Sequence, residues 1–250
     1  MSGHSKWATI KRKKGATDAA RGKIFTKLTR ELTTAARVGG GGDPSANSRL
    51  RKAIADAKAQ QMPSDSIKRA IQRGTGEIEG ASFDEVLYEG TGPAGTLFLA
   101  EAMTDNRNRT VSELRKVFEK HNGSLGSQGS AQWAFERMGV ITLDRQAATE
   151  DQLMEAVVEA GAQDYRDEGE LWVVYTPVEQ LDAVTTALEA AKLAIASSKV
   201  GYVPKTKKPI SGRDAEVCVN LASALDDHDD VQNVYVDFDI SDAELSSLTA

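Results

Sequence analysis

The sequence predicts an α+β protein with an N-terminal three-helix bundle followed by two α+β (ferredoxin-like) domains, the third inserted into the second. Helical periodicity begins at about residue 17 and indicates three helices within the first 75 residues, whereas the chain from Gly76 onward has the alternating pattern of strands. Residues 138–203 then follow the order strand, helix, strand, strand, helix, strand, which is that of a ferredoxin-like unit. The predicted domains are 1–76, then 77–136 with 204–240, the insertion 137–203, and a C-terminal tail at 241–250.

The first helix is predicted for residues 17–37. Apolar residues recur along it at steps of three and four, and they are Ile24, Leu28, Leu32 and Ala35. Basic residues lie on the opposite side of the helical wheel, and they are Lys23, Lys27, Arg30 and Arg37. We therefore expect one face to pack in the bundle and the other to meet phosphate or water.

Two shorter helices should complete the bundle. The four glycines at 39–42 are interpreted as a turn, because no Gly-Lys-Ser/Thr follows them as a phosphate loop requires. A second helix is expected from residue 46 or 47 to 61, and a third from an N-cap at Ser64 to a stop at Gly74. The pair forms either a DNA-binding helix-turn-helix, with Lys68, Arg69, Gln72 and Arg73 on its second member, or a plain helical hairpin.

The middle domain should start with a hairpin of strands at 86–89 and 96–103. A helix then begins at Asn108 or Thr110 and ends at Lys120, with Asp105 or Asn108 as its cap. The segment 131–135 is predicted to be a strand.

The remaining elements divide between the insertion and the end of the middle domain. In the insertion, strands are expected at 140–143, 164–167, 170–176 and 193–203, with helices at 150–160 and 178–190. A helix at 212–225 and a strand at 231–238 are too little to fold alone, so they should return to the middle domain.

Charge is distributed unevenly along the chain. Residues 1–75 contain 17 Lys and Arg against 5 Asp and Glu, a net charge of +12, whereas the remainder has 14 against 32, a net charge of −18. A basic head on an acidic body is typical of a protein that presents one part to a polyanion such as nucleic acid.

The N-terminal segment is the first candidate for contact with nucleic acid. Lys11, Arg12, Lys13 and Lys14 are consecutive bases, and Lys6 and Trp7 lie nearby. Trp7 could stack on a base or anchor the segment to the bundle. A second candidate is the segment 104–110, where Arg107 and Arg109 could bind phosphate at a helix N-terminus or pair with nearby acids.

No catalytic constellation, metal site or cofactor motif is evident, which favours a binding protein over an enzyme. The three histidines are far apart, and the acidic run 226–230 could hold a divalent cation or form a solvated turn. Cys218 is the single cysteine, which is typical of a reducing compartment, and apolar runs are far shorter than the ~18 residues of a membrane span. We expect a cytoplasmic protein without a membrane partner.

Several segments together resemble the YebC/PmpR family, which also includes the mitochondrial translational activator of cytochrome c oxidase subunit I. The matching segments are residues 3–11, 21–28, 69–76, 104–110, 123–126 and 133–136. The resemblance covers almost the whole chain. It implies the same three-domain fold, with the last segment returning to the middle domain.

The resemblance also implies a function. Members are generally named probable transcriptional regulatory proteins and are thought to bind DNA, while others are linked to the ribosome and to translation of proline-rich stretches. We therefore expect a DNA-binding transcriptional regulator, with a ribosome-associated translation factor that binds ribosomal RNA as the alternative. Nothing in the sequence indicates an oligomeric state. The predicted nucleic-acid-binding residues are Lys6, Trp7, Lys11, Arg12, Lys13, Lys14, Lys23, Lys27, Arg30, Arg69, Arg73, Arg107 and Arg109.

Overall fold

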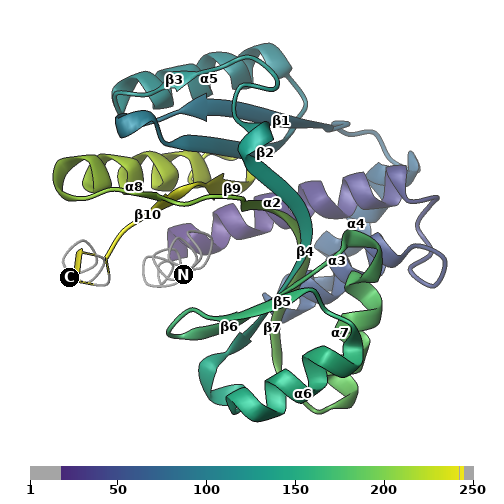
Figure 1. Cartoon of the computed structure of the whole chain (residues 1–250). Helices are drawn as coiled ribbons and strands as arrows, with labels where there is room; N and C mark the ends of the chain where they lie inside the picture. The colour runs from purple at the N-terminus through teal and green to yellow at the C-terminus, as the bar shows by residue number, and fades with distance from the viewer. Residues whose placement is uncertain (1–17, 242, 245–250) are drawn as a thin grey trace.

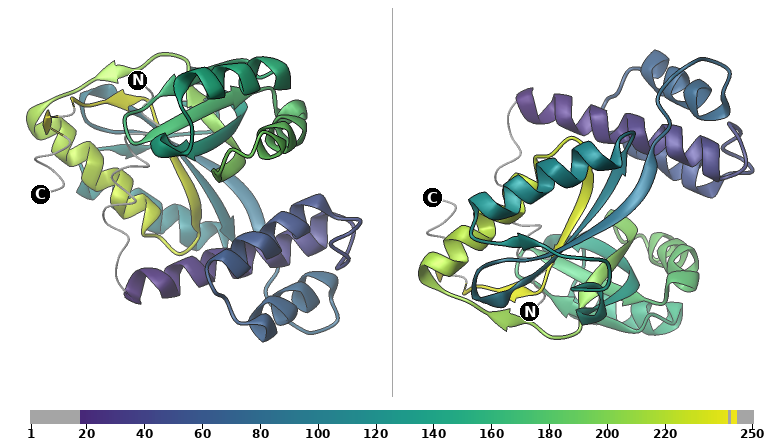
Figure 2. Two further views of the ribbon diagram at one scale, coloured as in Figure 1. Left: turned by 90° about the horizontal axis from the view of Figure 1, so that it is seen from below. Right: turned by 90° about the horizontal axis from the view of Figure 1, so that it is seen from above.

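The computed structural model describes residues 18–241 and 243–244. It has the mixed α+β architecture that the sequence predicts, with an N-terminal helical bundle, a middle sheet with its helices, and an inserted α+β domain (Figure 1). In both views of Figure 2 the bundle and the inserted domain stand apart from each other, and the middle sheet with its helices joins them. No helix within the described residues is long and apolar enough to cross a lipid bilayer.

The bundle consists of α2 (Asp18–Val38), α3 (Ser48–Ala59) and α4 (Ser64–Thr75). Asn47 caps α3, since its side-chain oxygen accepts the N–H of Leu50 at 2.9 Å. Its amide nitrogen donates to the carbonyls of Ala35 and Gly41 and so fixes the glycine turn between α2 and α3. The core of the bundle contains Leu32, Ala35, Ala36, Leu50, Ala53, Ala57, Met62, Ile67 and Ala70.

The ends of α4 differ from the prediction. Pro63, not Ser64, is the N-cap, because its carbonyl already accepts the N–H groups of Ser66 and Ile67. Gly74 does not stop the helix, which runs to Thr75 and ends at Gly76 with φ +80°. Gly74 instead allows close packing, since a Cβ there would lie 2.3 Å from the carbonyl oxygen of Thr33 in α2.

The middle sheet has the strand order β3-β1-β2-β9 and is antiparallel. Its strands are β1 (Asp84–Thr91), β2 (Leu97–Thr104), β3 (Ser124–Leu125) and β9 (Val231–Val236). Helices α5 (Arg107–Lys120) and α8 (Gly212–Asp226) pack on one face, where the side chains of Phe98, Leu114 and Cys218 are almost fully buried. The return of the last segment to this sheet confirms the predicted insertion.

The last predicted strand ends early. β9 ends at Val236 because the carboxylate of Asp237 accepts the N–H of Leu97 at 2.7 Å, which interrupts the ladder. Phe238 then begins a separate short strand, β10 (Phe238–Asp239), which pairs with β8 (Lys208–Pro209).

The inserted domain has the strand order β5-β6-β4-β7, with neighbouring strands antiparallel, which is the ferredoxin-like arrangement. Its elements are β4 (Phe135–Asp144), α6 (Glu150–Ala160), β5 (Asp164–Asp167), β6 (Leu171–Thr176), α7 (Leu181–Ala190) and β7 (Ile195–Pro204). The chain enters through β4 and leaves through β7. These two strands pair from Phe135 with Pro204 to Leu143 with Ile195, so the connection is itself a two-stranded ribbon.

The predicted strand at 131–135 is wrong. Gln132–Ala134 form a 3₁₀ turn, and Phe135 begins the long strand β4. The backbone N–H groups of Ala131 and Gln132 donate to the carboxylate of Glu89, so they are not available for a strand ladder.

Candidate nucleic-acid interface

Seven of the predicted nucleic-acid-binding residues lie within the described part of the chain. Lys6, Trp7, Lys11, Arg12, Lys13 and Lys14 lie outside it. The others are on α2 (Lys23, Lys27 and Arg30), on α4 (Arg69 and Arg73) and in the first turn of α5 (Arg107 and Arg109).

The basic face of α2 packs against the turn that joins α8 to β9. Lys23 Nζ lies 2.8 Å from Oδ1 of Asp227, and Lys27 Nζ donates to the carbonyl oxygen of Asp226 at 2.8 Å. From the sequence we expected this face to meet phosphate or water, whereas in the structure it contacts the acidic turn. The turn therefore pairs with bases of the same chain instead of being only a solvated loop.

Arg30 and Asp230 form the most buried part of this contact. Arg30 Nη1 lies 2.5 Å from Oδ1 of Asp230, 2.7 Å from the carbonyl oxygen of Asp229 and 2.9 Å from that of Met103. The Asp230 side chain is 2% exposed and also accepts hydrogen bonds from Thr110 and Arg109. Burial alone would raise the pKa of Asp230, but the bonds from Thr110, Arg109 and Arg30 outweigh it and lower the pKa to about 2.

Arg107 and Arg109 also pair with carboxylates. Arg107 Nε lies 2.9 Å from Oδ2 of Asp84, and Arg109 Nη2 lies 2.9 Å from Oδ1 of Asp105. The hydrogen bonds with Asp230 and, to a lesser extent, Asp105 raise the pKa of Arg109. The cap of α5 is Asn106, neither of the two residues predicted, because its side-chain oxygen accepts the N–H of Arg109.

Arg69 and Arg73 on α4 differ from the other five described candidates in their contacts. Both side chains are exposed, and neither makes an ion pair or hydrogen bond within the described residues. They are four residues apart, so they lie one turn apart on the same side of the helix. Of the seven described candidates, these two have guanidinium groups without a partner among residues 18–241 and 243–244.

The two arginines line a pocket of about 500 Å³ between α2, α4 and the segment that leads into β1. Its walls combine basic, aromatic and hydroxyl side chains, and the lining residues are Phe25, Thr26, Thr29, Arg30, Met62, Ser66, Arg69, Arg73, Ala81, Phe83 and Asp105. Arg30 reaches the pocket with its guanidinium carbon 5.2 Å from the centre of the Phe83 ring. Asp105 is the acidic residue of the pocket lining, and the Asp105 carboxylate is paired with Arg109.

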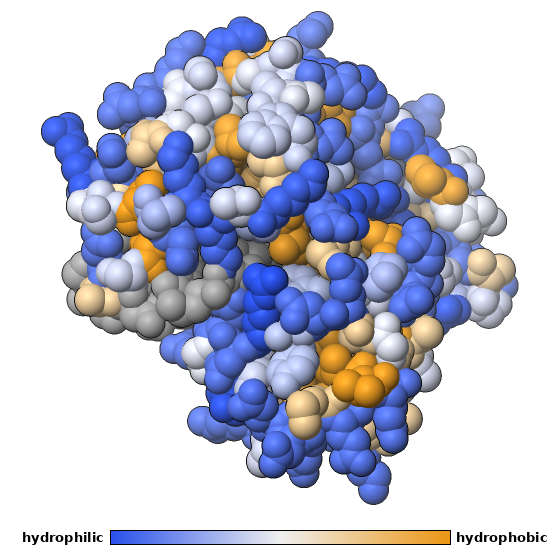
Figure 3. All heavy atoms as spheres, in the orientation of Figure 1, coloured by the Kyte–Doolittle hydropathy of each residue, from blue (hydrophilic) through white to orange (hydrophobic). Residues whose placement is uncertain are grey.

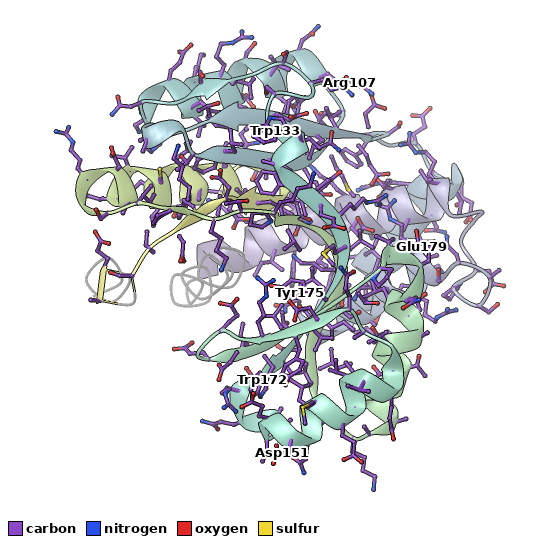
Figure 4. The ribbon with its side chains drawn as sticks, viewed as in Figure 1. Arg107, Trp133, Asp151, Trp172, Tyr175 and Glu179 are labelled. Atoms are coloured by element: carbon purple, nitrogen blue, oxygen red, sulfur yellow. The ribbon has the colours of Figure 1, made fainter. Side chains whose placement is uncertain are left out.

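Sequence reasoning missed how Trp133 is held. Trp133 is 67% exposed and lies where the chain passes from the middle sheet into β4 (Figure 4). The buried carboxylate of Glu89 accepts the N–H groups of Gly129, Ala131 and Gln132 at 2.6 to 2.7 Å, which fixes the turn that carries Trp133. A glutamate in a strand looks like an ordinary solvent-facing residue, so no sequence pattern indicates this role.

Glu113, His228 and Asp230 are close enough to share a metal ion, because their ligand atoms lie within 4.8 Å of one another. However, Nδ1 of His228 accepts the N–H of Asp230, which leaves the proton on Nε2 to bond Glu113 at 3.0 Å. Neither imidazole nitrogen then has a free lone pair, and Asp230 is already bound to two arginines. These residues fit an ion-pair network better than a metal site.

The face of the molecule in Figure 3 is mainly hydrophilic, with apolar residues in small separate groups. Large contiguous apolar patches are the usual sign of a stable protein interface. Among the described residues, this face shows no such patch.

Comparisons with known proteins cover nearly the whole chain. Residues 5–77 match the family described as TACO1/YebC protein N-terminal domain, and residues 83–238 match TACO1/YebC second and third domain. A protein of Desulfotalea psychrophila is 53% identical over 252 residues, covering 99% of this chain and 99% of its own. A protein of Geobacter sulfurreducens is 50% identical over 248 residues, covering 99% of this chain and 100% of its own. Both are named probable transcriptional regulatory protein.

A solved structure shows the same fold. The crystal structure of the conserved hypothetical protein Aq1575 from Aquifex aeolicus has a TM-score of 0.84 and 42% sequence identity. The match covers 90% of this chain and 93% of that one.

Proposed function

Because this chain belongs to the TACO1/YebC family, whose similar members are named probable transcriptional regulatory proteins, we propose that it regulates gene expression by binding nucleic acid. Following the names of these relatives, DNA is its first proposed target. The protein would act in the cytoplasm by binding and not as an enzyme.

The observation that carries the proposal is the unpaired basic side of α4. Arg69 and Arg73 have no acidic partner within the described residues, in a bundle segment whose net charge is +12 over residues 1–75. Guanidinium groups form two parallel hydrogen bonds with phosphate, which makes unpaired arginines effective contacts for a nucleic-acid backbone. The basic residues at 11–14 would add further phosphate contacts.

The bases of α2 contribute differently in this proposal. Lys23, Lys27 and Arg30 hold the bundle against the middle domain, so they orient the α4 surface instead of providing its main phosphate contacts. Arg107 and Arg109 are likewise paired, and their contribution would be to the local positive potential.

The test is the affinity of full-length protein for labelled DNA and RNA by fluorescence anisotropy. The double variant Arg69→Gln/Arg73→Gln should bind at least about tenfold more weakly, because two phosphate contacts are lost. The matched control is Arg115→Gln/Lys116→Gln, which removes the same charge from exposed positions on α5. Equal affinities for the two double variants would contradict the role of α4.

A ribosome-associated translation factor is the second candidate, and the shape of the α4 surface favours it. Helix-turn-helix proteins place a protruding helix in the major groove, whereas Arg69 and Arg73 line a pocket shared with Phe83 and Asp105. Sedimentation of tagged protein on a sucrose gradient separates the two. Co-migration with ribosomes that is lost in the Arg69→Gln/Arg73→Gln variant supports translation, and protection of a defined promoter without ribosome binding supports transcription.

A further inference from the structure

We propose that the pocket between α2, α4 and residues 81–83 binds one unpaired nucleotide of a single-stranded nucleic acid. In this arrangement Arg69 and Arg73 hold the phosphate, and the rings of Phe25 and Phe83 receive the base. The inference rests on the proposed function and specifies the form of nucleic acid that the pocket recognises.

The phosphate contacts come from one side of α4. Arg69 and Arg73 are one helical turn apart and line the same pocket, so two guanidinium groups can converge on one phosphate. Ser66 precedes Arg69 by three residues on the same side and adds a hydroxyl donor. Asp105 lies in the same lining, but it is paired with Arg109, which reduces its repulsion of an anion.

The surface for the base comes from α2 and the segment before β1. Phe25 and Phe83 are both partly buried, and both line the pocket. Arg37 donates to the hydroxyl of Ser82 and the carbonyl of Phe83, and the guanidinium of Arg30 lies over the Phe83 ring. The position of Phe83 is therefore fixed before any ligand arrives, and a preordered aromatic ring is what base stacking requires.

The shape of the pocket selects against duplex. Its volume of about 500 Å³ lies within the range of small-ligand sites, and one nucleotide is a ligand of this size. Besides the arginines of α4, the lining includes Ala81 and Phe83 from the segment before β1 and Asp105 from the segment before α5. A base that is paired and stacked in a duplex is not free to enter a pocket of one nucleotide's size, whereas an unpaired base can be turned out of its strand into it.

The combination of groups also matches a single-strand site better than a simple anion site. Positively charged grooves with aromatic side chains bind single strands by holding the backbone and stacking the bases. A site for free phosphate would need the arginines but not the rings. Substitution of the arginines therefore tests phosphate binding, and substitution of a phenylalanine tests base stacking.

The experiment measures binding of full-length protein to a labelled 12-nucleotide single strand, as RNA and as DNA, and to the matching duplex. The wild type should prefer a single strand, and Phe25→Leu should weaken single-strand binding at least about fivefold and so reduce the preference for single strand over duplex. Leucine preserves an apolar side chain for the bundle but removes the flat ring. Arg69→Gln/Arg73→Gln should weaken both forms.

The outcomes separate this inference from the proposed function. If Phe25→Leu binds single strands as tightly as the wild type while the arginine variant is weakened, the base-binding pocket is refuted and the proposed function stands. If the wild type binds none of the nucleic acids, both are refuted. A nucleoside monophosphate added in millimolar excess tests whether the free nucleotide competes; competition equal to that of inorganic phosphate would also refute base recognition.

A second measurement does not depend on the folding of any variant. A single strand containing 4-thiouridine, cross-linked by light to the wild-type protein, should attach to peptides containing Phe25, Phe83 or residues 62–73. Cross-links confined to other peptides would overturn the proposal.

Discussion

Arg30 of α2 and Asp230 in the turn directly before β9 form an ion pair between the N-terminal bundle and the middle domain, with Nη1 and Oδ1 2.5 Å apart. The side chain of Asp230 is 2% exposed and that of Arg30 is 12% exposed, and Arg109 and Thr110 bind the same carboxylate. It fixes the orientation of α2 and therefore of the pocket that α2 shares with α4.

Replacement of Asp230 should destabilise this contact strongly. In Asp230→Asn the two arginines lose their shared charge partner, and breaking a buried ion pair from one side costs about 3 to 5 kcal/mol. The free energy of unfolding from urea titrations checks this prediction. Asp229→Asn is the matched control, because Arg30 contacts the backbone carbonyl of Asp229 and not its carboxylate; a similar loss in both variants would contradict the assignment.

The contribution of Asp230 should also depend on pH. Its pKa is about 2 in the folded protein against an ordinary value of 3.8, so the ionised carboxylate stabilises the fold above about pH 4. This stabilisation, about 2 kcal/mol for a shift of that size, is lost as the pH falls from about 4 towards 2. The difference in unfolding free energy between wild type and Asp230→Asn should therefore shrink over that range, and a difference that stays constant would show that Asp230 is not the titrating group.

Gly74→Ala should destabilise the bundle although alanine favours helices. The new Cβ would meet the Thr33 carbonyl and the Ala36 side chain, and overpacking of this kind costs about 1 to 3 kcal/mol. Gly22→Ala in α2 is the control, since a Cβ there has open space and should be stabilising by about 0.5 to 1 kcal/mol. Thermal unfolding of both variants tests the close packing of α2 and α4. If Gly74→Ala stabilised the protein as much as Gly22→Ala does, this packing would be disproved.

Glu89→Gln should loosen the turn that carries Trp133. The two carboxylate oxygens of Glu89 accept all three N–H groups. In the glutamine variant one of these oxygens becomes an NH2 group, which cannot accept, so at least one backbone N–H loses its partner at a cost of about 1 to 3 kcal/mol. Hydrogen exchange of the amides of Gly129, Ala131 and Gln132 should become faster. Glu136→Gln, at an exposed position of β4, should leave these rates unchanged; unchanged rates in Glu89→Gln would contradict the anchoring role.

The order of elements could be predicted from the sequence because periodicity and turn residues are local. The ferredoxin-like unit and the return of the last segment to the middle sheet are confirmed for this reason. The ends of elements were predicted less well where tertiary contacts decide them. Gly74 continues α4 because α2 lies against it, and residues 131–134 leave the strand pattern because Glu89 takes their N–H groups.

The candidate site, too, could be predicted from the sequence only where local patterns decide it. Helical periodicity correctly separated Lys23, Lys27 and Arg30 from the apolar side of α2, but it could not reveal that an acidic turn some 200 residues later covers them. Arg69 and Arg73 looked no different from the other bases in the sequence. Only the tertiary structure shows that they lack partners within the described residues and share a pocket with Phe25 and Phe83.

The central claim is that the unpaired bases of α4, and not the paired bases of α2, contact nucleic acid. The salt dependence of affinity tests it most directly, because each lost phosphate contact reduces the slope of log affinity against log salt by about 0.7 to 0.9. The account predicts a slope about 1.4 to 1.8 units shallower for Arg69→Gln/Arg73→Gln than for wild type, and an unchanged slope for Arg115→Gln/Lys116→Gln. A slope for the α4 variant equal to that of the wild type would contradict it.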